Sequence, residues 1–146
     1  MLNKALDIAY KAHWGQTDKA GTPYKLHPTR VALHCQTEDE KIVALLHDVV
    51  EDTSMTLEEL KAQGFSNEVL AALKCLTQIE DEDYQTFIQR VATNPLAVKV
   101  KIQDLKDNMD LSRLDGKPHW KMETYKKALD YLEQCSNKKV LYVDMD

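Results

Sequence analysis

The strongest constraint on the fold is a helical spacing of apolar residues that recurs along most of the chain. The first stretch places apolar residues on one helical face, at Leu2, Ala5, Leu6, Ala9 and Ala12. Thr37 with Glu40, and Thr56 with Glu59, form capping boxes, which satisfy free backbone N–H groups at helix starts. Gly64 marks the end of the second of these helices. The pattern therefore predicts a chain built mainly of short helices.

The same signals predict four more helices after Gly64, over about residues 66–73, 84–91, 95–114 and 118–132. Ser66 and Asn94 are good N-cap residues, and Pro95 suits the first turn that follows. Asp115-Gly116 breaks the chain between the last two helices.

The tail, residues 136–146, contains a run from Val140 to Val143 that is strand-like by residue type. No partner strand is evident, so we interpret the tail as a packed arm or a partner contact. The chain has no internal repeat or linker, and its 146 residues are the usual size of one domain. We predict one all-α domain over residues 1–146, a bundle of short helices with its core at about 2–135.

Composition argues against a membrane protein. The chain is 43% hydrophobic and 29% charged, and no apolar run approaches the ~20 residues that a membrane-spanning helix needs. Lys4, Asp7 and Lys11 interrupt the first apolar stretch, which argues against a signal peptide. We therefore expect a soluble protein of the cytoplasm.

Charge and cysteine content exclude further classes. The net charge is −5 and no run of five or six basic residues occurs, so nothing indicates nucleic-acid binding. Cys35, Cys75 and Cys135 are odd in number and far apart, which indicates neither a disulfide framework nor a thiolate zinc site. An anionic substrate would need local positive charge in this acidic protein, and a metal ion is one way to supply it.

Four ionisable residues interrupt the apolar helix that begins after Thr37. They form two adjacent pairs four positions apart, His47-Asp48 and Glu51-Asp52. Residues four apart on a helix lie only roughly 40° apart around its axis, so all four share one broad face. An imidazole beside a carboxylate suits Mn²⁺, Fe²⁺ or Zn²⁺ better than Ca²⁺. Two ligands do not complete a site, so others must come from elsewhere.

Two further candidates lie beside apolar segments. His27 directly precedes Pro28, which can start a helix, so its ring can project from a rigid entry turn. Asp104 and Asn108 are four apart on one helical face, so that helix offers a carboxylate and an amide.

Three motifs in this order resemble those of the HD-domain superfamily, and in particular its alarmone-hydrolase branch. They are G-x-P-Y-x-x-H-P from Gly21, H-D-x-x-E-D-T from His47 and V-K-x-x-D-x-x-x-N from Val100. This branch includes the hydrolase domains of Rel/Spo-type proteins and small stand-alone hydrolases. The likeness runs from about Ala9 to Arg113, and the ordered combination is far more specific than an H-D pair alone.

The resemblance implies an HD-type helical bundle that removes the 3′-pyrophosphate from guanosine tetra- or pentaphosphate. It implies four ligands to Mn²⁺ or another divalent transition metal, namely His27, His47, Asp48 and Asp104. Glu51 and Asp52 would act on the attacking water, which agrees with the proton-accepting chemistry of carboxylates. Lys19 and Asn108 match positions that face the substrate, and Arg113 is a phosphate candidate by geometry.

One position departs from the family pattern. Rel/Spo-type hydrolase domains usually carry an arginine just before the position of Lys19, where it can stack on guanine, and this chain has Asp18. Three hypotheses stay open: hydrolysis of the guanosine alarmone, hydrolysis of another nucleotide by the same site, and a catalytically idle nucleotide-binding module. Intact Glu51 and Asp52 argue against the third. The sequence leaves the oligomeric state unspecified.

Overall fold

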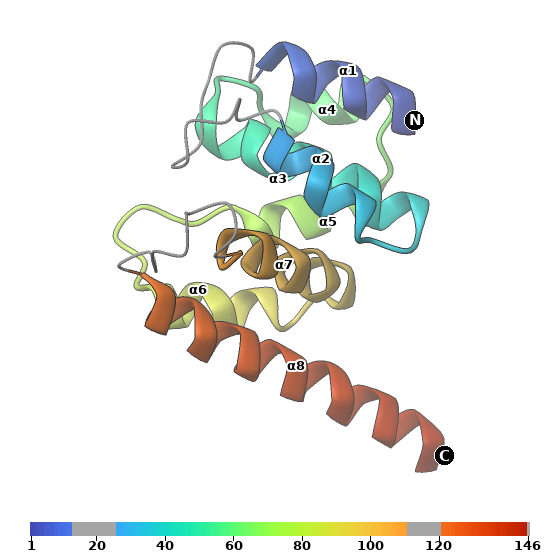
Figure 1. Cartoon of the computed structure of the whole chain (residues 1–146). Helices are drawn as coiled ribbons and strands as arrows, with labels where there is room; N and C mark the ends of the chain where they lie inside the picture. Colours follow the sequence, from blue (N-terminus) through green and yellow to red (C-terminus); the bar gives the residue numbers. More distant parts are fainter. Residues whose placement is uncertain (13–25, 111–120, 146) are drawn as a thin grey trace.

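The computed structural model describes residues 1–12, 26–110 and 121–145, and within these ranges it contains eight α-helices and no strand (Figure 1). This confirms the all-α prediction. The helices are α1 (Leu2–Ala12), α2 (Leu26–Leu33), α3 (Glu38–Asp52), α4 (Leu57–Ala62), α5 (Asn67–Leu76), α6 (Tyr84–Val91), α7 (Pro95–Asn108) and α8 (Met122–Met145). That the chain is a single domain stays a prediction.

Side-chain caps start the helices where the sequence predicted them. The side chains of Thr37, Thr56, Ser66 and Asn94 each accept a hydrogen bond from the backbone N–H three residues later, at 3.0–3.2 Å. Each bond satisfies a donor that the first turn would otherwise leave unpaired, which stabilises a helix by about 1 kcal/mol. Gly64 follows α4 with φ of +100°, a conformation that glycine adopts without strain.

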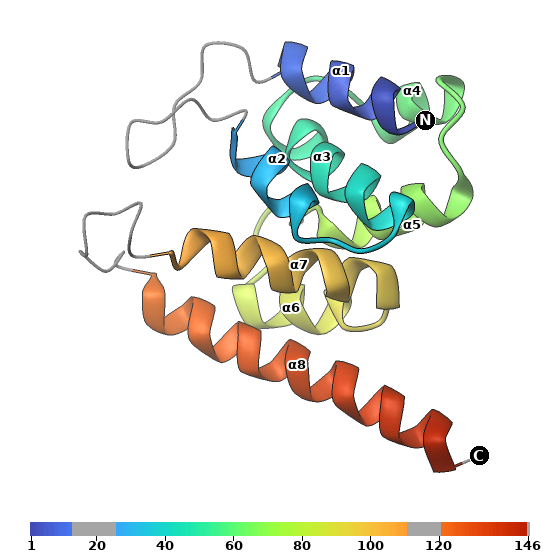
Figure 2. The ribbon, with the colours of Figure 1, turned by 45° about the vertical axis from the view of Figure 1, so that its right-hand side comes forward.

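Two helices, α3 and α7, form the centre of the molecule. Helix α3 packs against α1, α2, α5 and α7, and α7 packs against α2, α3, α5, α6 and α8. Figures 1 and 2 show the stack running from α1 and α4 at one end to α6 and α8 at the other. The middle of α3 is buried almost all round, and each fully buried Leu or Val contributes roughly 1.5–3 kcal/mol. The fully buried residues there are Val43, Ala44, Leu46 and Val49.

Two predicted boundaries were wrong. Helix α7 ends at Asn108, not near Leu114, and Met109 caps it with φ of −94° and ψ of 3°. Asn and Asp disfavour helix interiors, and Asp110 instead closes a turn by donating its N–H to the Asp107 carbonyl.

The strand-like run from Val140 to Val143 has a helical backbone and belongs to α8. Continuing an existing helix needs no new nucleation, whereas a strand needs a partner, so β-propensity is overridden.

No helix in the described part of the chain is long and apolar enough to cross a bilayer. In both ribbon views the last turns of α8 extend away from the other helices (Figures 1 and 2).

Arg90 on α6 ties α5 to the loop that follows it. Its guanidinium donates to the backbone carbonyls of Lys74 and Thr77, both at 2.8 Å, and to that of Cys75 at 3.2 Å. The same group pairs with the Glu82 carboxylate at 2.8 Å. Arg90 therefore supplies donors to carbonyl groups at the end of α5, which a helix leaves unpaired there.

We expect Arg90→Met to lower the free energy of unfolding by about 1–3 kcal/mol, because several charge-assisted bonds are lost and partly buried carbonyls lose their donor. Urea unfolding followed by circular dichroism measures this. The matched control is Lys11→Met, which breaks an exposed ion pair with Asp7 and should cost under about 1 kcal/mol. Equal stability of the two variants would contradict the capping role.

Candidate metal centre

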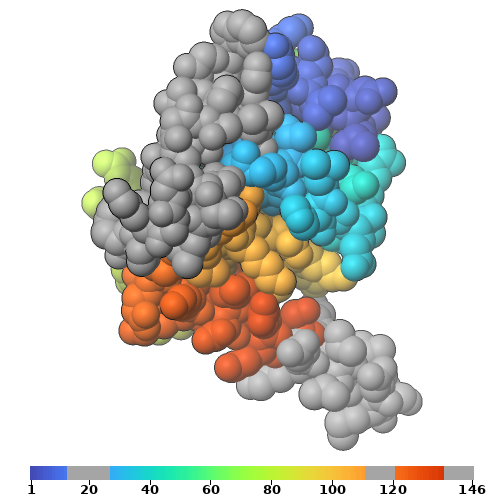
Figure 3. All heavy atoms as spheres, in the orientation of Figure 1, coloured from blue at the N-terminus to red at the C-terminus, as the bar shows by residue number. Residues whose placement is uncertain are grey.

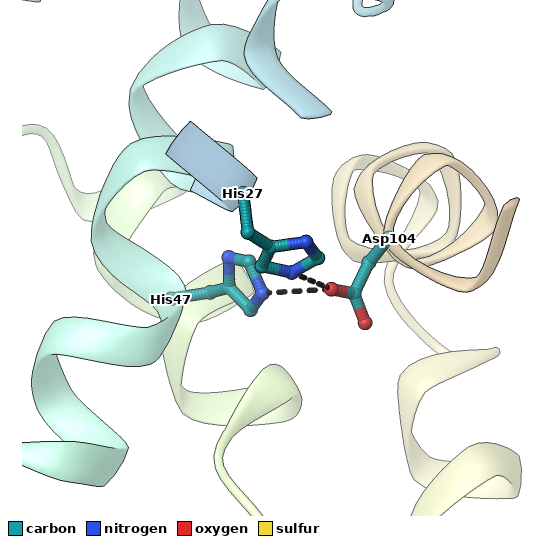
Figure 4. A group of neighbouring side chains, drawn as sticks. All are labelled: His27, His47 and Asp104. Carbon is teal, nitrogen blue, oxygen red and sulfur yellow. Dashed lines mark hydrogen bonds and ion pairs between the residues drawn. The ribbon is translucent and has the colours of Figure 1, made fainter. Parts of the chain in front are cut away.

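Three ionisable side chains from three helices meet in the interior. His27 comes from the first turn of α2, His47 from the buried middle of α3 and Asp104 from α7, and each is only 4% exposed. Figure 4 shows both imidazole rings pointing at one carboxylate oxygen of Asp104. The Nε2 atoms of His27 and His47 lie 2.9 and 3.3 Å from that Oδ1. One ligand atom from each residue falls within 4.8 Å of the other two, which is close enough for one ion.

Asp48 lies beside this group on α3. Its Oδ1 is 3.3 Å from Nε2 of His47, and its Oδ2 is 3.8 Å from Nε2 of His27. The side chain is 16% exposed, so it is less buried than those of His27, His47 and Asp104. The structure therefore brings together all four residues that the sequence proposed as ligands, and their binding of a metal stays a prediction.

Local structure orients each ring. His47 lies on the buried face of α3, and its Nδ1 is 2.7 Å from the carbonyl of Ala44, to which it donates. His27 has its Nδ1 2.5 Å from Oδ2 of Asp107. A ring that donates from Nδ1 has Nε2 available for a cation, which is the usual arrangement of metal-binding histidines.

Electrostatics favour protonated rings in the metal-free protein. Burial alone lowers the pKa of His27, but hydrogen bonds to Asp104 and Asp107 outweigh it and raise that pKa to about 10. The pKa of His47 is raised to about 9, because Asp48 and Asp104 outweigh its burial. Burial raises the pKa of Asp104, yet the charges around it hold that pKa well below the usual value. Without a metal, both rings therefore donate to Asp104.

Lys101 is a member of the site that sequence reasoning missed. Its Nζ lies 2.9 Å from Oδ2 of Asp104, one turn along α7, and its side chain is 13% exposed. The pKa of Lys101 is raised, because neighbouring carboxylates, Asp104 first, outweigh its burial. The i, i+3 spacing of the two residues was a usable signal, since oppositely charged residues at that spacing meet on a helix.

The proposed water-activating pair lies one turn beyond His47 and Asp48. Glu51 and Asp52 are exposed at the end of α3. The pKa of Glu51 is raised, first by partial burial of its carboxyl group and then by the charges of Asp48 and Asp52. A carboxyl group with a raised pKa is a better proton acceptor near neutral pH, so this environment suits a general base.

The predicted substrate-binding residues are only partly described. Asn108 is half-buried at the end of α7, one turn beyond Asp104. Lys19 and Arg113 lie outside the described residues, as does Asp18. Their roles therefore stay predictions from sequence.

The donor set fits a divalent transition metal. Two imidazoles and two carboxylates suit Mn²⁺, Fe²⁺ or Zn²⁺, and both rings already have Nδ1 engaged elsewhere. Burying so many ionisable groups in one place is costly in a protein unless they are paired or bind an ion. The centre can therefore hold a cation.

Sequence comparison finds relatives among alarmone enzymes. The chain is 32% identical over 120 residues to the guanosine-3′,5′-bis(diphosphate) 3′-pyrophosphohydrolase of Aquifex aeolicus, covering 74% of this chain and 17% of that protein. It is 40% identical over 82 residues to the enzyme of that name in Borreliella burgdorferi, covering 53% of this chain and 12% of that one. It is 29% identical over 125 residues to the Escherichia coli bifunctional (p)ppGpp synthase/hydrolase SpoT, at 74% and 17% coverage. The chain thus spans at most 17% of these three relatives.

The fold has a solved counterpart. A metazoan ortholog of SpoT, described as hydrolysing ppGpp, matches with a TM-score of 0.71 at 24% identity, covering 94% of this chain and 92% of that one. No model of a known protein family matches the sequence. The sequence relatives and the shared helical fold agree with the motifs built around His47 and Asp104. The matches in sequence and the shared fold therefore support a Rel/Spo-type HD hydrolase domain in this chain.

Proposed function

We propose that this chain removes the 3′-pyrophosphate from guanosine tetra- and pentaphosphate in a reaction that depends on a divalent metal, with Mn²⁺ as the leading ion. The observation that carries the proposal is the meeting of His27, His47 and Asp104 in one buried group, with Asp48 beside it. The names of the relatives in Aquifex and Borreliella support the substrate.

In this mechanism, His27, His47, Asp48 and Asp104 would hold the ion. When bound, a divalent cation acidifies water and offsets negative charge on phosphoryl oxygens. Glu51 takes the proton of the attacking water, with Asp52 next to it as the alternative acceptor. The water oxygen bonds to phosphorus, the bond to the ribose 3′ oxygen breaks, and pyrophosphate leaves. The 3′ oxygen takes up a proton and becomes a hydroxyl group.

The second candidate function uses the same metal centre and hydrolyses a different nucleotide. Asp18 is an acidic side chain where the family usually has an arginine, and it repels a polyanion instead of stacking on guanine. A nucleoside monophosphate or an adenine-containing alarmone is then the substrate.

A nucleotide panel with Mn²⁺ tests both candidates. Guanosine tetraphosphate, its adenine analogue and nucleoside monophosphates are incubated with the protein, and phosphate and pyrophosphate release are measured. Asp48→Ala is the control for metal dependence. Pyrophosphate released from the guanosine compound alone supports the first candidate, whereas turnover of another nucleotide alone replaces it with the second. No turnover of any compound would contradict both.

We expect Glu51→Gln to lower kcat by about 10²- to 10⁴-fold, because the attacking water loses its proton acceptor. Metal affinity should change little, since Glu51 is exposed and lies one turn from the buried group. Steady-state kinetics and a Mn²⁺ titration of the same preparation separate the two effects. A variant that loses metal binding together with activity would move Glu51 from proton transfer to ligand.

A further inference from the structure

Both ring nitrogens of His27 contact a carboxylate, and one of the two carboxylates, that of Asp107, has no role in the proposed mechanism. Its Nε2 faces Asp104 at 2.9 Å, while Nδ1 lies 2.5 Å from Oδ2 of Asp107. Asp104 and Asp107 are three residues apart on α7, so one helical face contacts both sides of one ring. The ring plane of His27 is therefore fixed by α7, although the residue itself belongs to α2.

Asp107 is in turn fixed by Arg30. The Nε and a terminal nitrogen of Arg30 donate to Oδ1 and Oδ2 of Asp107, at 2.9 and 3.2 Å. A guanidinium that engages both carboxylate oxygens fixes the plane of that carboxylate, which a lysine ammonium does not do. The side chain of Asp107 is only 10% exposed, so little water competes for its oxygens.

These contacts lie along the seam between α2 and α7, which Figure 3 shows side by side on one face of the molecule. Arg30 is three residues after His27 on α2, so both side chains lie on the same face of that helix. The chain of contacts runs from Arg30 through Asp107 to the ring of His27, and ends at the ligand group.

We propose that Asp107, held by Arg30, is a positioning residue that keeps the proton of His27 on Nδ1 and aims Nε2 at a divalent cation. A carboxylate acceptor at Nδ1 selects this tautomer and strengthens the imidazole as a ligand, and loss of such a partner typically weakens metal binding by 10- to 100-fold. The inference rests on the proposed metal centre and assigns it two residues beyond the ligands.

Asp107→Asn tests the proposal, and Glu133→Gln is its matched control. Glu133 is an exposed carboxylate paired with Lys106 at 4.0 Å, so its substitution removes the same charge away from the centre. We expect Mn²⁺ titration to show affinity weakened about 10- to 100-fold in Asp107→Asn and unchanged in Glu133→Gln. Thermal unfolding of the metal-free proteins shows whether each variant folds. Arg30→Gln replaces Asp107→Asn if the latter does not, and should weaken affinity in the same direction.

A spectroscopic reading separates positioning from a purely structural role. In the Zn²⁺-loaded protein, nitrogen-15 NMR of the His27 ring should show one Nδ1–H tautomer with a strongly downfield proton. In Asp107→Asn that proton should move upfield. Wild type that binds metal beside an Asp107→Asn variant with equal affinity and an unchanged ring signal overturns this inference alone. Failure of the wild type itself to bind Mn²⁺ or Zn²⁺ overturns the metal centre and this inference together.

Discussion

Asp104→Asn is expected to abolish divalent-metal binding and hydrolysis. One carboxylate oxygen of Asp104 lies close to both rings, with Nε2 of His27 at 2.9 Å and Nε2 of His47 at 3.3 Å. An amide is a far weaker ligand than a carboxylate, so affinity should fall by more than the about 100-fold seen for loss of outer partners. Without the ion, kcat/KM should fall by at least about 10³-fold. A Mn²⁺ titration and the nucleotide assay measure the two losses.

The same substitution leaves buried charges behind. Lys101 and the two protonated rings lose their shared anion, and breaking a buried pair costs about 3–5 kcal/mol. The double variant Asp104→Asn with Lys101→Met removes one unpaired cation and should recover part of this stability without recovering metal binding. Metal binding at wild-type affinity in either variant would show that Asp104 is no ligand.

Metal binding is expected to release close to two protons at pH 7. Both rings are protonated in the metal-free protein at that pH, because the pKa values of His27 and His47 are raised from 6.5 to about 10 and about 9. Each ring must lose its Nε2 proton to bind a cation. Apparent affinity should therefore rise about tenfold per pH unit for each proton, so about 100-fold from pH 6 to pH 7. Calorimetry in two buffers of different ionisation enthalpy counts the protons directly.

The same pKa shifts set the pH dependence of the metal-free fold. A histidine with a raised pKa in the folded state contributes stability that is fully present below its unfolded value of 6.5 and is lost as pH rises through the folded pKa. The melting temperature of the metal-free protein should therefore fall between pH 7 and pH 10, and saturating metal should flatten this fall. Proton release near zero, with a flat melting profile, would mean that the rings are neutral before the metal binds.

The parts of the fold that were predictable depend on local chemistry. Thr37 and Asn94 announce helix starts because a capping side chain and the N–H that it satisfies are three residues apart. The predicted ends of the last two helices were wrong for opposite reasons. Helix α7 stops early because Asn and Asp near its end disfavour a helix interior, whereas α8 continues past Leu132 because an existing helix extends at little cost.

The residues of the metal centre also differ in how far the sequence alone identifies them. His47 and Asp48 stand out from sequence because ionisable residues in a buried helix are unusual there. Asp107 does not, since a charged residue near a helix end is common, and for Lys101 the only signal is its spacing of three residues from Asp104. Their roles come from tertiary contacts such as that between His27 and Asp107, which are 80 residues apart. Sequence therefore indicates the ligands and conceals the residues that orient them.

The three-helix origin of the buried group makes an ion in it a cross-link of the chain. His27 and Asp104 are 77 residues apart, and His47 and Asp104 are 57 apart, so one cation would close two long loops at once. Closing long loops restricts the unfolded chain more than closing short ones, as it does for disulfides. An ion would then raise the free energy of unfolding by joining α2, α3 and α7. In a metal-starved cell the protein would lack this cross-link and would unfold more readily.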